Sequence, residues 1–347
     1  MEIKALKFGY NRRKMLNFAA SNMASLSEIR TSLGDDLRRM NDIISDTLRS
    51  DTPLMNTIVE QYLRVKGKQL RPMLVLLCAR LVGQVSEGVL YGGAAIELLH
   101  NASLIHDDVI DQARQRRGRD TISSVWTNHI AVLVGDFFVT GALRCAVKTN
   151  NSAVLESLAQ MGSDLSLGEI QQYDTARQRN ITEPGYFTII EKKTASLFVS
   201  CATIGALAAG GTRTDIDALT RWARLLGLVF QIKDDTFDYD IADNHVGKPT
   251  GNDLREGKVT LPLIYALGRT DHPLHASMNQ LARKEILTTD EIAALVDYAR
   301  QAGGIDYAYE KMRALEAEAS ELLDSFPAGD AADSLRTIFR YIIEREK

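Results

Sequence analysis

The sequence predicts an all-α protein, a single-domain bundle of long, mostly antiparallel helices. Three observations support this class. Apolar residues recur at helical spacing along almost the whole chain, alternating strand-like runs are lacking, and glycine and proline stand between the helical segments. The chain has 347 residues, of which 45% are hydrophobic. That is enough apolar material for one large core, so a helical bundle follows.

Glycine and proline mark the limits of several expected helices. Gly67 precedes a segment that carries Pro72 in its first turn, where proline fits a helix. Gly118 ends the helix of the first of two aspartate clusters, Gly210-Gly211 closes an apolar helix, and residues 247–257 form a glycine-spaced loop. In chain order, the expected helices cover residues 25–49, 52–65, 70–83, 88–113, 121–148, 152–179, 182–210, 213–239, 258–269, 289–302, 304–325 and 330–344.

The first 22 residues differ from residues 23–347, which carry the helical pattern. They hold five basic residues against one acid, Glu2. We expect a disordered tail, or an upstream start codon with Met15 or Met23 as the true beginning. A targeting peptide is the alternative, but this segment has no signal-type apolar core or cleavage site.

Composition excludes several classes of function. The net charge is −4, so nothing points to a nucleic-acid partner. The cysteines, Cys78, Cys145 and Cys201, sit in apolar helical contexts without metal-binding spacing and are expected to be reduced core residues. No apolar run looks long enough to span a bilayer, the longest being residues 197–210, so we expect no stable membrane anchor and a cytoplasmic location.

Two aspartate clusters of the same shape are the most informative feature. Asp107, Asp108 and Asp111 follow one apolar helical stretch, and the second cluster repeats this spacing after another; its members are Asp234, Asp235 and Asp238. Aspartates at i and i+4 share a helix face, about 5–6 Å apart. Like charges this close need a counter-charge near an apolar core, and Mg²⁺ with oxygen ligands and substrate phosphates supplies one. Two opposed faces would clamp a metal-bound diphosphate.

Basic residues flank both clusters. Arg116 and Arg117 lie at or beyond the end of the first helix, and their planar forks suit phosphate oxygens. Lys68 and Arg71 share a face near a helix start, where anions are favoured. His100 could donate to a phosphate, although a core histidine is the alternative.

Further candidates lie in the second half of the chain. Lys193-Thr194 enters a buried stretch, where a lysine needs an anionic partner, unless it is a surface lysine whose charged end reaches water. Gln231 precedes the second cluster by one turn and could bind phosphate or a neighbouring backbone group. The loop at 247–258 could close over the site and supply Lys248 and Lys258, but its pattern is not that of a P-loop.

In this order and spacing, these residues resemble the trans-isoprenyl diphosphate synthase family (polyprenyl synthetases), from about residue 25 to the end. The resemblance implies the isoprenoid synthase fold, with a deep central cavity, in a catalytic domain at 23–347, and a homodimer. It implies a prenyltransferase that adds isopentenyl diphosphate to an allylic prenyl diphosphate, with more than one Mg²⁺ per site.

The resemblance also implies roles for the candidates. Asp107, Asp111 and Asp234 would bind Mg²⁺ directly, with support from Asp108, Asp235 and Asp238. The residues expected to hold the allylic diphosphate are Arg116, Lys193, Thr194, Gln231, Lys248 and Lys258. Those expected to hold isopentenyl diphosphate are Gly67, Lys68, Arg71, His100 and Arg117. Lys193 and Lys248 would also aid catalysis, and the departing pyrophosphate would accept the proton.

Product length should depend on residues one turn before Asp107. Ala102 and Ser103 lie roughly 6–7.5 Å deeper along that helix. Family members that stop at farnesyl diphosphate usually carry a bulky aromatic residue there. Because both side chains are small here, we expect an open tunnel, with Phe137 or Phe138 as candidate floor, and a hexaprenyl to decaprenyl product for a quinone side chain.

Four alternatives stay open at this point. A short-chain farnesyl or geranylgeranyl diphosphate synthase would need a tunnel floor closer to Asp107. His106-Asp107 occurs in HD-type metal phosphohydrolases, but that interpretation leaves the second cluster unexplained. Terpene cyclases usually replace the second cluster by a mixed motif, and non-catalytic subunits of heteromeric synthases typically lose one or both clusters, whereas both are intact here.

Overall fold

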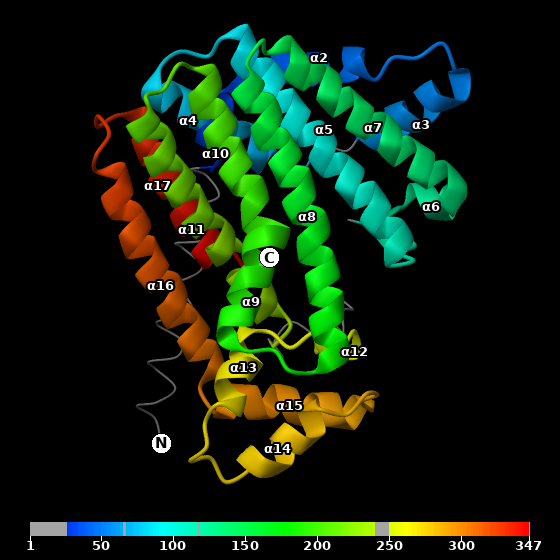
Figure 1. Ribbon diagram of the computed structural model, residues 1–347, viewed down its shortest axis with the longest axis vertical. Coiled ribbons are helices and arrows are strands. Elements are labelled where there is room, and N and C mark those ends of the chain that lie inside the picture. Colours follow the sequence, from blue (N-terminus) through cyan, green and yellow to red (C-terminus); the bar gives the residue numbers. More distant parts are fainter. Residues whose placement is uncertain (1–25, 65–66, 117, 240–249, 347) are drawn as a thin grey trace.

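The computed structural model describes residues 26–64, 67–116, 118–239 and 250–346, and these are predominantly helical. Figure 1 shows long helices packed side by side in an upper body, with a layer of shorter helices below it. In chain order the elements are α2 (Gly34–Thr47), α3 (Pro53–Leu63), α4 (Leu70–Val82), α5 (Glu87–Ile110), β1 (Gln115–Arg116), β2 (Arg119–Asp120), α6 (Ile122–Val125), α7 (Asn128–Lys148), α8 (Ser152–Gln178), α9 (Glu183–Ile190), η1 (Glu191–Ala195), α10 (Ser196–Ala208), α11 (Arg213–Phe237), α12 (Asn252–Arg255), α13 (Leu261–Leu267), α14 (His275–Ala282), α15 (Thr289–Gln301), α16 (Gly304–Leu323) and α17 (Asp330–Glu344).

The predicted all-α class is confirmed, with local differences. The helix of the first cluster ends at Ile110, and Gly118 lies instead in the turn of a small β1–β2 hairpin, where its φ of +73° suits glycine. The helix expected over 182–210 is divided into α9, η1 and α10, and α14 was not expected. Hydrophobic periodicity located the long helices but could not detect these interruptions.

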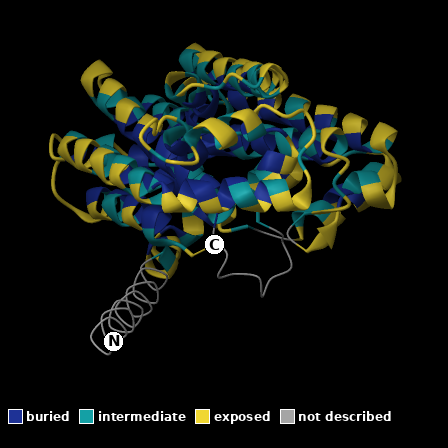
Figure 2. Ribbon diagram, turned by 90° about the horizontal axis from the view of Figure 1, so that it is seen from below, coloured by how far each residue is buried: buried dark blue, intermediate teal, exposed yellow. Residues whose placement is uncertain are grey.

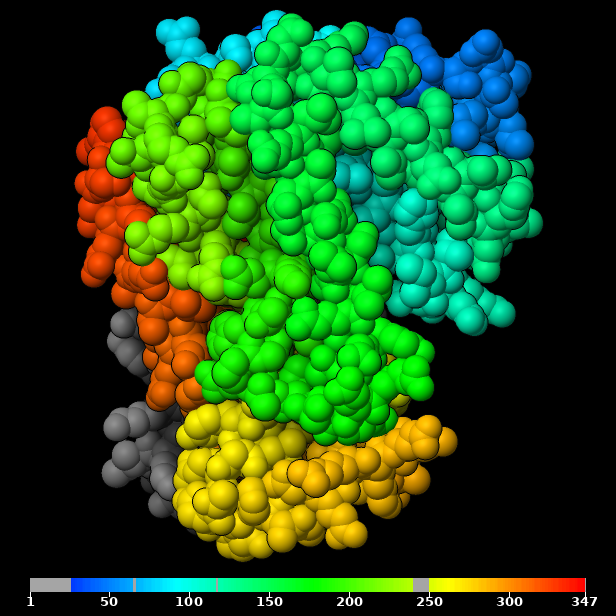
Figure 3. Space-filling model, viewed as in Figure 1, coloured from blue at the N-terminus to red at the C-terminus, as the bar shows by residue number. Residues whose placement is uncertain are grey.

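Most of the long helices share one core. Helix α5 is buried on nearly all sides and packs on α2, α4, α7 and α10, as expected for a helix that is apolar all round. Figure 2 shows the buried residues gathered through the middle of the bundle. A second, smaller cluster lies among α13, α14 and α15, and in the space-filling view this layer lies directly below residues of α8 and α9 (Figure 3).

The expectation that no apolar segment is long enough to span a bilayer is wrong, judged by length and composition. Among the described residues, α7 is long and apolar enough to cross a bilayer, and 44% of its most apolar window is buried inside the bundle. Its inner face packs on α5, while Val132, Leu133 and Val147 are exposed. A single helix of this kind is weak evidence for a membrane span, because core helices of soluble proteins pass the same test.

The π-helix η1 carries two of the residues that the sequence predicts to bind the allylic diphosphate. Its residues include Lys193 and Thr194, and such π-helical turns are frequent at functional positions. Helix α8 approaches it closely at Gly168, where an added Cβ would lie 2.7 Å from the backbone nitrogen of Lys193. A side chain at position 168 would therefore push α8 away from η1.

The contact at Gly168 leads to the first prediction. Gly168→Ala should lower the free energy of unfolding by about 1–3 kcal/mol, the usual cost of overpacking, because the obstructing atom is backbone and cannot rotate away. The midpoint of urea-induced unfolding measures this change. Gly162→Ala on the same helix is the control. Its Cβ would make an ordinary 3.7 Å contact with Leu99, and the gain in helix propensity should leave stability unchanged or higher. Equal midpoints for the two variants would refute the packing argument.

Candidate active site

Both aspartate clusters lie at the C-terminal ends of helices. Asp107 and Asp108 occupy the last turn of α5 and Asp111 follows it as the C-cap, while Asp234 and Asp235 lie in the last turn of α11. The helix dipole places partial negative charge at this end, so carboxylates there are unfavourable without a cation. The fold therefore has two negatively charged helix ends, and nearby positive charge would stabilise each of them.

The acids of the first cluster point in different directions. Asp107 is half-buried, and burial together with the nearby Glu169 carboxylate raises its pKa to about 6. Asp108 is buried and accepts a 2.7 Å hydrogen bond from Arg116 Nε. Asp111 is exposed. Arg116, predicted to bind the allylic diphosphate, is thus held by Asp108 in this structure, and Arg117 lies outside the described residues.

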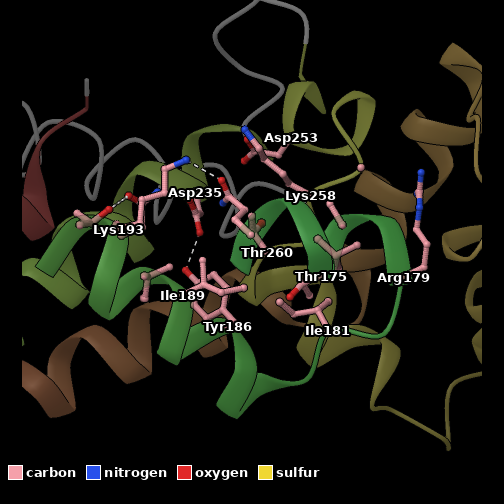
Figure 4. A pocket seen from close by; sticks show the side chains of 17 residues that line it. Thr175, Arg179, Ile181, Tyr186, Ile189, Lys193, Asp235, Asp253, Lys258 and Thr260 are labelled. Carbon is pink, nitrogen blue, oxygen red and sulfur yellow. Dashed lines mark hydrogen bonds between the residues drawn. The ribbon is translucent and has the colours of Figure 1, made fainter. Parts of the chain in front are cut away.

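The acids of the second cluster also divide. Asp234 pairs with Arg345, yet burial still raises the pKa of Asp234. Asp235 is fully inside, where it accepts hydrogen bonds from Tyr186 Oη at 2.6 Å and from Gln231 Nε2 at 2.8 Å. Burial, followed by the negative charge of Asp253, raises the pKa of Asp235 to about 8. Figure 4 shows the Tyr186–Asp235 hydrogen bond among the side chains that line the pocket.

Asp238 has a structural task that its sequence context did not suggest. Its two carboxylate oxygens accept hydrogen bonds from the backbone N–H groups of Asn252 and Asp253, at 2.8 and 3.0 Å. Asp238 therefore caps the start of α12 and fixes one end of the loop that carries Lys258. Its supporting role for a metal ion stays a prediction.

Four of the six residues predicted to hold the allylic diphosphate line one cavity, and Arg116 does not. It has a volume of about 120 Å³, and Figure 4 shows Lys193 and Lys258 among its lining side chains. Thr194 Oγ1 donates a 2.6 Å hydrogen bond to Gln231 Oε1, which orients that amide toward Asp235. The predicted residues that line this cavity are Lys193, Thr194, Gln231, Asp235 and Lys258. Lys248 lies outside the described residues.

Residues predicted to hold isopentenyl diphosphate converge on a second cavity, of about 600 Å³. Its predicted lining residues are Gly67, Lys68, Arg71 and His100. Glu97, Phe230 and Arg345 also line it. Both cavities therefore adjoin the end of α11, the first through Gln231 and Asp235 and the second through Phe230, and α5 reaches only the second, through residues 97–104.

Several residues of the site were not predicted. Lys193 pairs with Glu169 and donates a 2.6 Å hydrogen bond to Gln172, so α8 supplies its anionic partner. Glu169 and Gln172 lie at i and i+3 beside Gly168. This spacing could have indicated a helix face turned toward the site. Tyr186 and Arg345 carried no comparable signal in the sequence.

The residues for product length lie as expected along α5. Ala102 is buried, and Ser103 is half-buried with its hydroxyl donating to the His100 carbonyl at 2.9 Å. Of the two candidate floor residues, Phe138 is fully buried and makes an edge-on contact with Tyr62. Phe137 is half-buried, and which of the two forms the tunnel floor stays a prediction.

His100 and His106 have different surroundings, whereas the HD-type alternative needs His100 as a second metal-binding histidine beside the His106-Asp107 dyad. His106 Nε2 lies 3.3 Å from the Val132 carbonyl and 3.5 Å from Asp136, both on α7. His100 instead lines the second cavity with Lys68 and Arg71. The two rings therefore have different neighbours.

The donor set fits a hard divalent cation. Asp107, Asp234 and Asp235 carry raised pKa values, chiefly because burial disfavours their charged forms. Within the described part of the chain, no three acidic, histidine or cysteine side chains gather closely enough to hold an ion alone. Mg²⁺ suits this arrangement, since it binds through one or two carboxylates and takes its remaining ligands from water and substrate phosphates.

Comparisons with known proteins agree with this geometry. A family model described as polyprenyl synthetase matches residues 52–299. The octaprenyl diphosphate synthase of Haemophilus influenzae is 30% identical over 328 residues, which are 93% of this chain and 98% of that relative. The structure of a decaprenyl diphosphate synthase from Rhodobacter capsulatus superposes with a TM-score of 0.86 at 30% identity, covering 93% of this chain and 99% of that one. A polyprenyl synthase from Caulobacter crescentus CB15, solved with calcium and isoprenyl diphosphate, gives a TM-score of 0.84 at 32% identity and covers 93% of this chain and 98% of that one. The chain therefore belongs to the polyprenyl synthetase family.

Proposed function

We propose that this protein is a trans-prenyltransferase that condenses isopentenyl diphosphate with an allylic prenyl diphosphate to give an all-trans polyprenyl diphosphate of hexaprenyl to decaprenyl length. The observation that carries the proposal is that two separate cation-lined cavities adjoin the carboxylate-bearing end of α11, one through Asp235 and the other through Phe230 and Arg345. One cavity suits each diphosphate. The names of the relatives, which include octaprenyl and decaprenyl diphosphate synthases, support a long product. The homodimer and the cytoplasmic location implied by the resemblance stay predictions.

The protein's own residues bind and orient the two substrates. Lys193, Thr194 and Lys258 would hold the allylic diphosphate, while Lys68 and Arg71 would hold that of isopentenyl diphosphate. The C1–O bond of the allylic substrate breaks and its electron pair leaves with pyrophosphate. The alkene of isopentenyl diphosphate then forms the new C–C bond to C1, and a proton is lost to the departing pyrophosphate.

Electrostatics and exclusion of water account for the rate. Mg²⁺ held by Asp107, Asp111 and Asp234 would stabilise the negative charge that develops on the leaving group. Holding alkene and C1 in contact removes an entropic barrier of up to ~7–11 kcal/mol in well-oriented systems. Apolar walls such as Phe198 and Phe230 keep water from the reactive carbon.

The metal ligands are tested by neutral replacement. Asp107→Asn and Asp234→Asn should each reduce kcat by about 10²–10³-fold, since each removes charge that holds the leaving-group counterion. The measurement is incorporation of labelled isopentenyl diphosphate into chains started on farnesyl diphosphate with Mg²⁺. Asp217→Asn is the control, because Asp217 pairs with Arg213 at the exposed start of α11. Full activity in either site variant, or nucleotide phosphate release by the wild type without prenyl transfer, would contradict the proposal.

Stability should depend jointly on pH and Mg²⁺. The raised pKa of Asp107 means that the folded protein binds this proton more tightly than the unfolded chain does. The ordinary pKa of an aspartate is 3.8, and that of Asp107 in the folded protein is about 6. The stability that this group contributes is therefore lost as the pH rises from 3.8 through about 6. Bound Mg²⁺ should restore it, by about 2.7 kcal/mol at 100 times the dissociation constant.

Thermal unfolding checks this expectation. Mg²⁺ should raise the Tm clearly at pH 8 and less at pH 5, where protonated Asp107 competes with the metal. In Asp107→Asn the response at pH 8 should shrink. An equal Mg²⁺ effect at both pH values would rule out Asp107 as a ligand.

Product length is tested on α5. Ala102→Phe and Ser103→Phe should shorten the product toward farnesyl or geranylgeranyl diphosphate, because either ring would fill the space one turn below Asp107. Ser103→Ala, which adds no volume, is the control and should keep the long product. Reversed-phase chromatography of the dephosphorylated products reads the length. Unchanged chains in both phenylalanine variants would show that the tunnel runs elsewhere.

A further inference from the structure

Arg345 lies between the second aspartate cluster and the larger cavity. It is the first residue beyond α17, and its backbone N–H donates to the Tyr341 carbonyl at 2.9 Å. Its guanidinium pairs with Asp234 and lies 4.2 Å from the ring centroid of Phe230. It also lines the cavity of Lys68, Arg71 and His100. One side chain thus contacts a predicted metal ligand and faces the predicted site of the second substrate.

The arginine has binding capacity that its present partners leave unused. Its side chain is only 11% exposed, and among the described residues its buried Nε–H has no hydrogen-bond partner. Buried donors are nearly always satisfied in folded proteins, so an exception calls for an explanation. A guanidinium fork binds phosphate oxygens through two parallel N–H groups, and a diphosphate in this cavity would meet that need.

The contact with Asp234 conflicts with metal binding. Arg345 Nη2 occupies Oδ1 of that carboxylate, and a divalent cation bound there would repel the guanidinium. The aromatic faces of Phe230 and Phe237 lie 4.2 and 5.7 Å from the guanidinium carbon. Both rings offer the cation favourable contact.

The last turns of α17 are also connected to this cavity through Lys68, which lines it. Lys68 Nζ donates a 2.8 Å hydrogen bond to Tyr341 Oη and lies 5.5 Å from the centre of that ring. A diphosphate that engages Lys68 would compete with Tyr341. It would thereby act on the helix end that carries Arg345.

We infer that Arg345 is a positioning residue that couples the two substrate sites. This inference rests on the proposed function. In the free protein Arg345 neutralises Asp234. When Mg²⁺ and the allylic diphosphate take Asp234, the guanidinium turns to the diphosphate of isopentenyl diphosphate beside Lys68 and Arg71. Because coupling between sites is reciprocal, isopentenyl diphosphate also makes Asp234 available to the metal.

Calorimetric titration tests this coupling without turnover. Isopentenyl diphosphate is titrated into the full-length protein alone, and again with saturating Mg²⁺ and an allylic thiodiphosphate whose bridging sulfur prevents reaction. Typical couplings between sites are about 5–150-fold, and we expect the Kd of the wild type to tighten within that range. The coupling ratio is the Kd for isopentenyl diphosphate without the other ligands divided by the Kd with them. In Arg345→Gln this ratio should fall to within about twofold of one.

Two further measurements separate charge from geometry. Mg²⁺ titrated alone should bind more tightly to Arg345→Gln, because the competing cation is gone. Arg345→Lys keeps the charge but loses the fork, so it should compete with Mg²⁺ like the wild type while showing a reduced coupling ratio. If Arg345→Gln does not fold, the coupling ratio of Arg345→Lys tests the inference in its place. Arg336→Gln, on the same helix and paired with Asp324, is the matched control and should behave as the wild type.

The outcomes distinguish this inference from the function on which it rests. Binding of both ligands to the wild type without coupling, or full coupling in Arg345→Gln, overturns the role of Arg345 and leaves prenyl transfer intact. Failure of the wild type to bind either diphosphate overturns both.

Discussion

Negative charge at two helix ends is the constraint on which the structure depends. Helices α5 and α11 each end in aspartates, where the dipole adds to the repulsion between carboxylates. The bundle tolerates this because its own cations lie against the acids: Arg116 on Asp108 and Arg345 on Asp234. These pairs neutralise charge in the free protein. They also lie where a metal ion bound to substrate would interact favourably with the carboxylates.

Close packing turns these charges into a defined site. The absence of a side chain at Gly168 brings α8 against η1, so that Glu169 and Gln172 reach Lys193. Thr194 then orients Gln231, and Gln231 reaches Asp235. A chain of short hydrogen bonds thus connects α8, η1 and α11, and a shift of α8 would disturb all of them.

Sequence patterns predicted the helices and much of the site, but not its internal pairing. The clustered aspartates and the group of Lys68, Arg71 and His100 carry local spacing that survives folding, and the structure places that basic group around one cavity. Arg345 and Tyr186 meet their partners across 111 and 49 positions of the chain. Such contacts depend on how helices pack, which periodicity does not encode. The split at η1 was missed because its residues, EKKTA, are also compatible with an α-helix, and nothing in their order marks the wider turn.

The environment of Asp235 has a consequence for the surroundings of the protein. Burial raises the pKa of this carboxyl well above its usual range, so the carboxyl favours its protonated form, and a cation arriving beside it would promote release of the proton. Loading of the site would then acidify an unbuffered solution. The heat of loading would also vary with the ionisation enthalpy of the buffer, so titration in two buffers that bind Mg²⁺ weakly, such as PIPES and HEPES, would show whether protons are released.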